Sequence, residues 1–390
     1  MQFRPKNTVN DHRILFVLCH SALIMCIAIS YRVWFPVPRA FPELPVFDVA
    51  IPFFVSIFSS VLFVLALFLL SIPKVPVKFK NLAIVFMIIY ALGDYNRIQA
   101  WFFYFLVFIG IYFNVPEQRK KLTIYGGILS CVYLMSGVLK LNGGFANSTF
   151  IWFITPIESF LPSSSYQIIV DKFWITAPIV ELSAGLGLLF RKTARLAAGV
   201  LIAMHILILG IVGPLGWNTN LVIWPWNLAF MGLLYYLFIY LKDPVIDIKQ
   251  MTTGYSRYTS ITLIVFFVLL PVLSIWNLWP KHLSGALYSG NKIKSEVLIP
   301  DELALQLQNI YKPPHNGLEY VVQPNAWAIQ ELQVALYPSE RAHKILYRQL
   351  CKSYPEYSDY FVFISKPVLS HFTGKRDKIS FFCSDFRPSE

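Results

Sequence analysis

The chain has 390 residues, of which 56% are hydrophobic and only 14% are charged. Soluble domains usually carry about 25% charged residues, so this composition excludes an ordinary soluble protein and predicts a helical membrane protein with several spans. The formal net charge is +12, but the lysines and arginines stand mostly in short gaps between apolar runs. No basic helix with interleaved stacking aromatic residues is present, so we do not expect nucleic-acid binding.

Nine apolar runs are candidates to cross a bilayer, which takes about twenty residues. They cover residues 14–31, 49–72, 82–93, 98–115, 123–141, 173–190, 194–212, 221–241 and 260–279. The first run lacks a small-residue cleavage site, so we expect it to remain as a span rather than to act as a cleaved signal peptide. The short apolar stretch 150–161 contains Pro156 and Glu158, which favours an interfacial or re-entrant segment.

The gaps between these runs alternate in charge. Basic residues precede the first run and follow the second, fourth, sixth and eighth, whereas GPLGWNTN after the seventh has none. The positive-inside rule therefore places the N-terminus in the cytoplasm and the C-terminus outside. We expect a multi-pass protein of a bacterial inner membrane or an equivalent membrane, in contact with lipids. Its all-α polytopic bundle of about nine spans would occupy residues 1–279.

The remaining residues, 280–390, are more polar and predict a small extracytoplasmic α+β domain. IPDELALQLQNIY and YPSERAHKILYRQLCKSY begin with Pro–Asp and Pro–Ser, which are typical helix starts. LEYVVQ, DYFVFISKP and KISFFCS have the composition of strands. Cys351 and Cys383 lie here, and the sequence leaves open whether they form a disulfide. Cys19, Cys26 and Cys131 lie in spans and are expected to be packing residues.

Lys140 is an ionisable residue inside an apolar run, and such residues are candidates for function. It ends the fifth span, near the expected outer boundary. Its ammonium either extends to the lipid headgroups or stands in a dry pocket where it can act as a base. Tyr133 and Gly137 lie on the same helix face, and the small residues Ser136 and Gly137 would let a neighbouring helix come close.

Glu181 and His205 lie in the middle of the sixth and seventh spans. A buried carboxyl is either protonated or paired, so Glu181 is a structural hydrogen-bonding group or a partner in proton transfer. A lone histidine is a packing residue, a proton relay or a ligand contact. Because Lys140, Glu181 and His205 come from spans joined by short connections, we expect them to gather around one chamber in the outer half of the membrane.

Two further segments contribute candidates for ligand contact. WPWN begins the eighth span, and its tryptophans form either an interfacial aromatic belt or, because Pro225 would break the helix, the lining of a cavity. GDYNRIQAW faces the same side, and its acidic and basic residues either pair with each other or line the mouth of that cavity. The candidate ligand-binding residues are Tyr133, Trp224, Trp226, Asn227, Asp94 and Arg97.

Three of these segments resemble a known family. YLMSGVLKLNGGF, ELSAGLGLLF and the span that carries His205 are similar to the membrane domain of vitamin K-dependent gamma-glutamyl carboxylases, which is shared with the HTTM (horizontally transferred transmembrane) proteins. The resemblance covers about residues 122–233 and not the C-terminal region. It implies that Lys140 is the base that deprotonates vitamin K hydroquinone and that His205 matches a histidine of the equivalent span. The outer region of the carboxylases, which binds peptide, is larger than residues 280–390.

Two functions therefore stay open. The first is a quinone- or lipid-linked membrane enzyme of the carboxylase-like group, with Lys140, Glu181 and His205 as catalytic residues, a hydroquinone as cofactor, and a peptide or protein substrate on the outer side. The second is a non-catalytic membrane anchor, or a maturation or export factor, whose outer domain binds a partner protein. A transporter ranks last because no inverted repeat is visible. No zinc motif appears, so we expect no metal.

Overall fold

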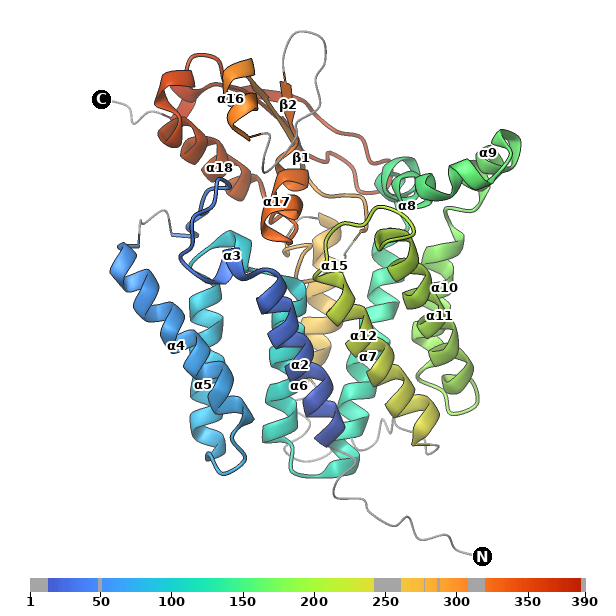
Figure 1. Ribbon diagram of the computed structural model, residues 1–390. Coiled ribbons are helices and arrows are strands. Elements are labelled where there is room, and N and C mark those ends of the chain that lie inside the picture. Colours follow the sequence, from blue (N-terminus) through green and yellow to red (C-terminus); the bar gives the residue numbers. More distant parts are fainter. Residues whose placement is uncertain are drawn as a thin grey trace, which may run out of the picture.

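The computed structural model describes residues 13–47, 51–241, 261–276, 278–285, 288–307 and 320–386. Long helices stand side by side in a bundle, and the strands and short helices of the C-terminal region cover one end of it (Figure 1). This end is called the capped end below. The predicted architecture of a helical bundle followed by a small α+β region is confirmed at this level.

Helices form where the nine apolar runs predicted them. Their bounds are α2 (Arg13–Ile29), α4 (Phe53–Ser71), α5 (Val77–Ala91), α6 (Ala100–Asn114), α7 (Gln118–Lys140), α10 (Thr176–Gly187), α11 (Ala194–Val212), α12 (Ile223–Leu234) with its π-helical continuation Tyr235–Tyr240, and a last helix, Ile261–Trp276, that includes α15 (Leu270–Leu273). Among the described residues, four helices are long and apolar enough to cross a membrane: α4, α7, α11 and Ile223–Tyr240. Three others are apolar but shorter: α2, α6 and Ile261–Trp276.

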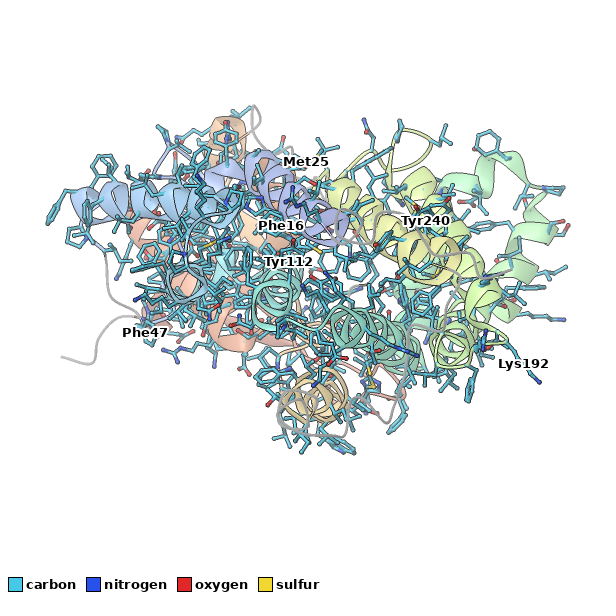
Figure 2. The ribbon with its side chains drawn as sticks, turned by 90° about the horizontal axis from the view of Figure 1, so that it is seen from below. Phe16, Met25, Phe47, Tyr112, Lys192 and Tyr240 are labelled. Carbon is cyan, nitrogen blue, oxygen red and sulfur yellow. A yellow bond between two sulfur atoms is a disulfide. The ribbon has the colours of Figure 1, made fainter. Side chains whose placement is uncertain are left out.

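The outer faces of these helices are apolar. Phe58 and Phe68 of α4 are 64% and 65% exposed, and Leu196 of α11 is 74% exposed. Figure 2, which views the structure from the end opposite the C-terminal region, shows side chains such as Met25 and Tyr240 at the rim of the bundle. Large exposed apolar surfaces are rare on soluble monomers, and they suit a surface that contacts lipid.

The connections at the capped end are short helical segments. They comprise α3 (Tyr31–Trp34), η1 (Tyr95–Arg97), η2 (Phe145–Thr149), α8 (Phe150–Ile154), η3 (Thr155–Phe160) and α9 (Ser163–Lys172). The stretch 150–161, predicted to be interfacial or re-entrant, thus forms two short helices beside the C-terminal region (Figure 1).

The C-terminal region contains a four-stranded antiparallel sheet in the order β2-β1-β3-β4. Its elements are β1 (Lys294–Ile299), α16 (Asp301–Leu307), β2 (Tyr320–Val322), α17 (Pro324–Leu332), α18 (Glu340–Ser353), β3 (Val362–Lys366), β4 (Ile379–Phe381) and the turns η7 (Pro355–Tyr357) and η8 (Cys383–Phe386). Three strands and two helices were predicted. The central strand β1 and helix α17 were not, because polar residues interrupt the apolar pattern of both segments.

Cys351 of α18 and Cys383 of η8 form a disulfide that closes a loop across 32 residues of sequence. The pairing that the sequence left open is therefore present, and it is consistent with an extracytoplasmic location of this region. We expect its loss in Cys351→Ala to destabilise the C-terminal region by about 3 to 4 kcal/mol, through the entropy of the opened loop. In denatured, unreduced protein, maleimide labelling should modify only the three free cysteines, Cys19, Cys26 and Cys131. Labelling of all five would contradict the pairing.

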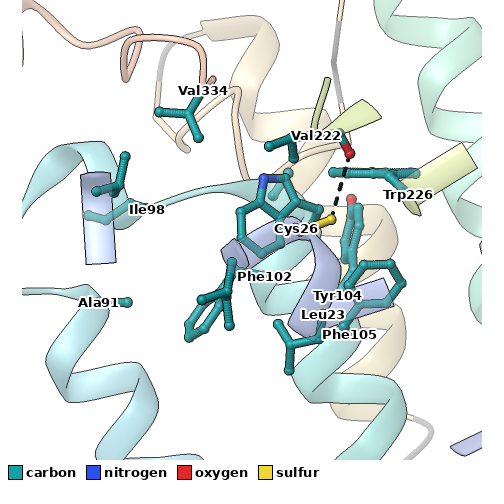
Figure 3. Packing of buried hydrophobic residues seen from close by; sticks show 14 of the residues in the cluster. Leu23, Cys26, Ala91, Ile98, Phe102, Tyr104, Phe105, Val222, Trp226 and Val334 are labelled. Atoms are coloured by element: carbon teal, nitrogen blue, oxygen red, sulfur yellow. Dashed lines mark hydrogen bonds between the residues drawn. The ribbon is translucent and has the colours of Figure 1, made fainter. Parts of the chain in front are cut away.

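One hydrophobic core runs from the bundle into the C-terminal region. Figure 3 shows Leu23 and Cys26 of α2 packed with Phe102 of α6 and Trp226 of α12, close to Val334 of the C-terminal region. The Cys26 thiol donates a hydrogen bond of 3.6 Å to the Val222 carbonyl. The buried core thus crosses the predicted boundary between residues 279 and 280.

Hydrogen bonds join the two parts as well. The Glu331 carboxylate, which is 6% exposed, accepts the backbone N–H groups of Ala40 and Phe41 at 2.6 and 2.8 Å. Trp327 donates to the same carboxylate at 2.8 Å. The C-terminal region is therefore fixed to the capped end and brings its own residues close to the ends of the bundle helices.

Candidate functional site

The site begins with a close contact between α7 and α10. A Cβ atom at Gly137 would lie 2.6 Å from the Pro178 carbonyl oxygen, and one at Gly185 would lie 2.6 Å from the Leu134 nitrogen. The Ser130 hydroxyl donates to the Gly185 carbonyl at 2.5 Å. Only glycine permits this backbone approach, as the small residues around Gly137 predicted. The contact places Glu181 of α10 directly against α7.

Lys140 and Glu181 form a buried ion pair. Lys140 Nζ lies 2.6 Å from both carboxylate oxygens of Glu181 and donates to the Ser136 hydroxyl at 2.8 Å. Lys140 is 8% exposed and Glu181 4%. Because side chains on a helix lean toward its N-terminus, the ammonium turns back into the bundle toward Ser136. It is buried and does not extend to the surface of the bundle.

The pair satisfies its own hydrogen-bonding needs. An ammonium has three N–H donors, and here two face the Glu181 carboxylate and one faces Ser136. Burying two charges is costly, and the cost is offset only when geometry and extra hydrogen bonds are good. The arrangement therefore holds an ammonium nitrogen against two carboxylate oxygens in a buried site.

A second chain of hydrogen bonds joins Tyr133, His205 and Asn227. The Tyr133 hydroxyl lies 2.5 Å from His205 Nε2, and His205 Nδ1 lies 2.5 Å from Asn227 Oδ1. The Asn227 Nδ2 group donates to the Ile223 carbonyl at 2.6 Å, which fixes the orientation of the amide. Asn227 Oδ1 is then an acceptor, so Nδ1 of His205 carries the proton and the Tyr133 hydroxyl donates to Nε2. All three residues are buried.

The two networks are neighbours. The charges of Lys140 and Glu181 both act on His205. Tyr133 precedes Lys140 by two helical turns, which is about 10 Å along α7. The rings of Tyr133 and His205 lie 6.3 and 6.2 Å from that of Phe230. The structure thus brings together Lys140, Glu181, His205, Tyr133 and Asn227, with aromatic side chains along one side.

The tryptophans of the WPWN segment lie differently from the prediction. Helix α12 begins at Ile223, so Pro225 stands in its first turn, where a missing N–H breaks no helical hydrogen bond. The predicted break in the helix is wrong. Trp226 is 8% exposed and packs between Tyr104 and Phe230. The centre of its ring lies 5.9 Å from that of Tyr104 and 5.6 Å from that of Phe230.

Trp224 points to a different neighbourhood. It packs in a separate apolar cluster with Leu209, Val212 and Ile223. A Cβ atom at Gly213 would lie 2.7 Å from the Trp224 ring. Trp226 therefore contacts Phe230, the ring that packs against Tyr133 and His205. Trp224 is a packing residue between α11 and α12.

Asp94 and Arg97 serve the connection between α5 and α6. Asp94 pairs with Arg39 at 3.1 Å and accepts the backbone N–H of Leu44 at 3.1 Å. Arg97 lies over the Tyr90 ring at 4.2 Å and donates to the Val33 carbonyl at 3.0 Å. The side chains of Asp94 and Arg97 do not pair with each other, because the partner of Asp94 is Arg39. These contacts hold α3 and the chain before Leu44 against α5.

Sequence reasoning missed two lysines of the C-terminal region: Lys292, which is near enough to Lys140 for their charges to interact, and Lys281, which is near Lys292. Lys292 is half-buried, and the charges of Lys281 and Lys140 both act on it. Burial and these neighbouring charges lower the pKa of Lys292 to about 8. Burial, together with Arg376, lowers the pKa of Lys281 to about 8 as well. The segment WPKHLSGALYSGNKIK shows that lysines follow the last helix, but nothing in it shows that they lie over α7.

The sequence matches no known protein family, and neither a curated protein nor a solved structure is similar to it. Among the described residues, no group of three or more His, Cys, Asp and Glu side chains could hold a metal ion. The chemistry of the site therefore has to be inferred from its own residues.

Proposed function

We propose that this chain is an integral membrane protein whose Lys140–Glu181 pair performs acid–base chemistry on a weakly acidic, quinone- or lipid-like molecule at the capped end of the bundle. The observation that carries the proposal is the burial of this pair beside the Tyr133–His205–Asn227 chain. Ionisable groups buried within apolar helices are rare, and they mark reaction or transport sites more often than simple packing. The alternation of basic gaps and the disulfide support an extracytoplasmic capped end.

A naphthohydroquinone of the vitamin K type is the ligand we propose to test. It would supply an acidic O–H group on an apolar ring. The residues present suit such a group, because Tyr133, Trp226 and Phe230 provide aromatic packing and the Lys140–Glu181 pair provides a proton acceptor. The proposed enzyme class is the carboxylase-like group that the segments around Lys140 and Glu181 resemble, with an outer peptide or protein as the further substrate.

The proton would move within the pair first. Lys140 Nζ passes one proton across the 2.6 Å contact to Glu181, which leaves a neutral amine beside a neutral carboxylic acid. Lys140 Nζ then takes the acidic proton of the ligand and becomes an ammonium again, facing the negative charge left behind. His205 is a neutral neighbour that can accept the Tyr133 proton at Nε2.

The test is the ionisation of a bound naphthohydroquinone in maltoside micelles without oxygen, followed by the absorbance of its ionised form across pH. In the wild type we expect the apparent pKa of the bound hydroquinone to fall by at least about one unit, equal to about 1.4 kcal/mol. Lys140→Met should abolish the fall while tryptophan fluorescence still reports binding. The matched control is Lys121→Met, because Lys121 is also in α7, is 7% exposed and lies over the Tyr112 ring at 4.4 Å. Identical titrations with and without Lys140 would contradict the proposal.

The second candidate is a non-catalytic anchor or maturation factor whose outer region binds a partner. The observation in its favour is that the pair is saturated by its own partners, so that it can serve simply to join α7 to α10. In that case the apparent pKa of the hydroquinone is the same with and without the protein.

A further inference from the structure

The C-terminal region lies directly on the residues that follow Lys140. The Gly143 N–H donates to the Phe372 carbonyl at 2.7 Å, and the Asn142 amide donates to the Ser289 carbonyl at 2.8 Å. A Cβ atom at Gly143 would lie 2.3 Å from the Thr373 oxygen. The NGG sequence after Lys140 thus lets two segments of the C-terminal region, 288–292 and 370–376, rest against the end of α7.

Positive charge gathers at this junction. Lys281 donates to the Asn291 carbonyl, and Arg376 donates to the carbonyls of Lys292 and Gly290 at 2.7 and 3.0 Å. These partners are neutral. Among the ion pairs of the described residues, none gives a carboxylate to Lys281, Lys292 or Arg376. Glu181 of α10, which lies against α7, is already paired with Lys140.

The surroundings of these cations also hold atoms without partners. His282 is 1% exposed, is acted on by the charge of Lys292, and has an Nδ1 atom with no hydrogen bond. His371, acted on by the charge of Lys281, likewise has a buried Nδ1 without a partner. Buried polar groups are normally satisfied, and gathered positive charges are costly without a counter-charge. An anionic ligand would supply the counter-charge that the gathered cations lack.

We propose that Lys281, Lys292 and Arg376 form a binding site for a phosphate or phosphate-ester anion at the junction of the C-terminal region with α7. Lysine ammonium groups bind phosphate as point charges, and a doubly charged anion matches two lysines. The junction is at the end of α7, where the headgroups of a surrounding bilayer would lie, so the phosphate can belong to a lipid or be free in solution. The site does not require proton transfer by Lys140, and its test is independent of the hydroquinone titration.

The pKa values of the two lysines reflect their burial beside other positive charges. Burial is the main cause that holds the pKa values of Lys281 and Lys292 at about 8, below the usual value for lysine, and the charge of Arg376 near Lys281 and those of Lys281 and Lys140 near Lys292 add to it. A bound anion would favour the charged forms and raise both values.

The experiment is thermal unfolding of the full chain in uncharged maltoside micelles at constant ionic strength set with chloride. One arm adds inorganic phosphate, and the other adds phosphatidic acid or, as its comparison, phosphatidylcholine. At saturation we expect the melting temperature of the wild type to rise by about 3 to 6 °C in at least one arm. A rise with inorganic phosphate identifies a free anion as sufficient, and a rise with phosphatidic acid alone identifies a lipid headgroup.

Lys292→Met and Lys281→Met should each lose most of this rise. The matched control is Lys344→Met, because Lys344 belongs to α18, is half-buried like Lys292 and pairs with Glu340 at 3.0 Å. Without added anion, Lys292→Met should melt no lower than the wild type, because the substitution removes a positive charge that has no counter-charge. A melting temperature at or above that of the wild type shows that the variant folds. An equal rise in all variants, or no rise in either arm, would overturn the proposal.

Discussion

Glu181→Leu is expected to destabilise the folded protein by about 3 to 5 kcal/mol. The substitution leaves the Lys140 ammonium buried, with only Ser136 as a hydrogen-bond partner. Removing one member of a buried ion pair costs this much because the remaining charge has lost its compensation. The free energy of unfolding is measured by titration with sodium dodecyl sulfate from mixed micelles.

The double variant Lys140→Met/Glu181→Leu is the decisive comparison for the same pair. Replacing both partners by apolar residues of similar volume is often neutral or stabilising, so the double variant should recover most of the lost stability. If the stability lost in the double variant equals the sum of the losses in the two single variants, the two side chains do not interact. That result would contradict the structure.

Gly137→Leu should prevent α7 and α10 from packing. A Cβ atom at this position would lie 2.6 Å from one backbone atom of α10 and 2.7 Å from another, and backbone atoms in a helix cannot move aside separately. Overpacking usually costs about 1 to 3 kcal/mol and more where nothing can yield, so we expect a large loss of folded protein. Yield and monodispersity after solubilisation in maltoside provide the measurement.

Gly199→Leu is the matched control for this prediction. Gly199 also lies in a long apolar helix, α11, but a Cβ atom there would meet nothing within 4 Å. The control should fold like the wild type. If both leucine variants fold equally well, the close contact between α7 and α10 is wrong.

The helices could be predicted because their physical signal is local. Apolar runs of sufficient length and basic gaps indicate where helices begin and end, and the structure has helices at each of those places. Gly137 and Ser136 also predicted a close helix contact correctly. Lys140 and Glu181 were identified singly, since a charge in an apolar run is conspicuous in any sequence.

The partners of these residues could not be predicted, because pairing depends on how one helix is rotated against another. Nothing in the sequence distinguishes Arg39 from Arg97 as the partner of Asp94, although they are 55 and 3 positions away. The burial of Trp226 against Tyr104 likewise depends on the rotation of α12.

The C-terminal region illustrates the same limit over a longer distance. Its helices α16 and α18 were recognised from local start signals, and Ser339 accepts the N–H of Ala342 at 3.1 Å as a cap. That this region rests on the NGG segment, and carries Lys292 toward Lys140, follows from contacts between residues about 150 positions apart. Such contacts leave no periodic signal in the sequence.

The measurement that tests proton transfer by Lys140 most directly is the hydroquinone titration of Lys140→Arg. Arginine keeps the positive charge and can pair with the Glu181 carboxylate, but its guanidinium does not lose a proton. We predict that Lys140→Arg folds and binds the naphthohydroquinone yet ionises it no better than Lys140→Met does. Ionisation at the wild-type level in Lys140→Arg would show that only the charge of residue 140 matters, and would contradict its role as the base.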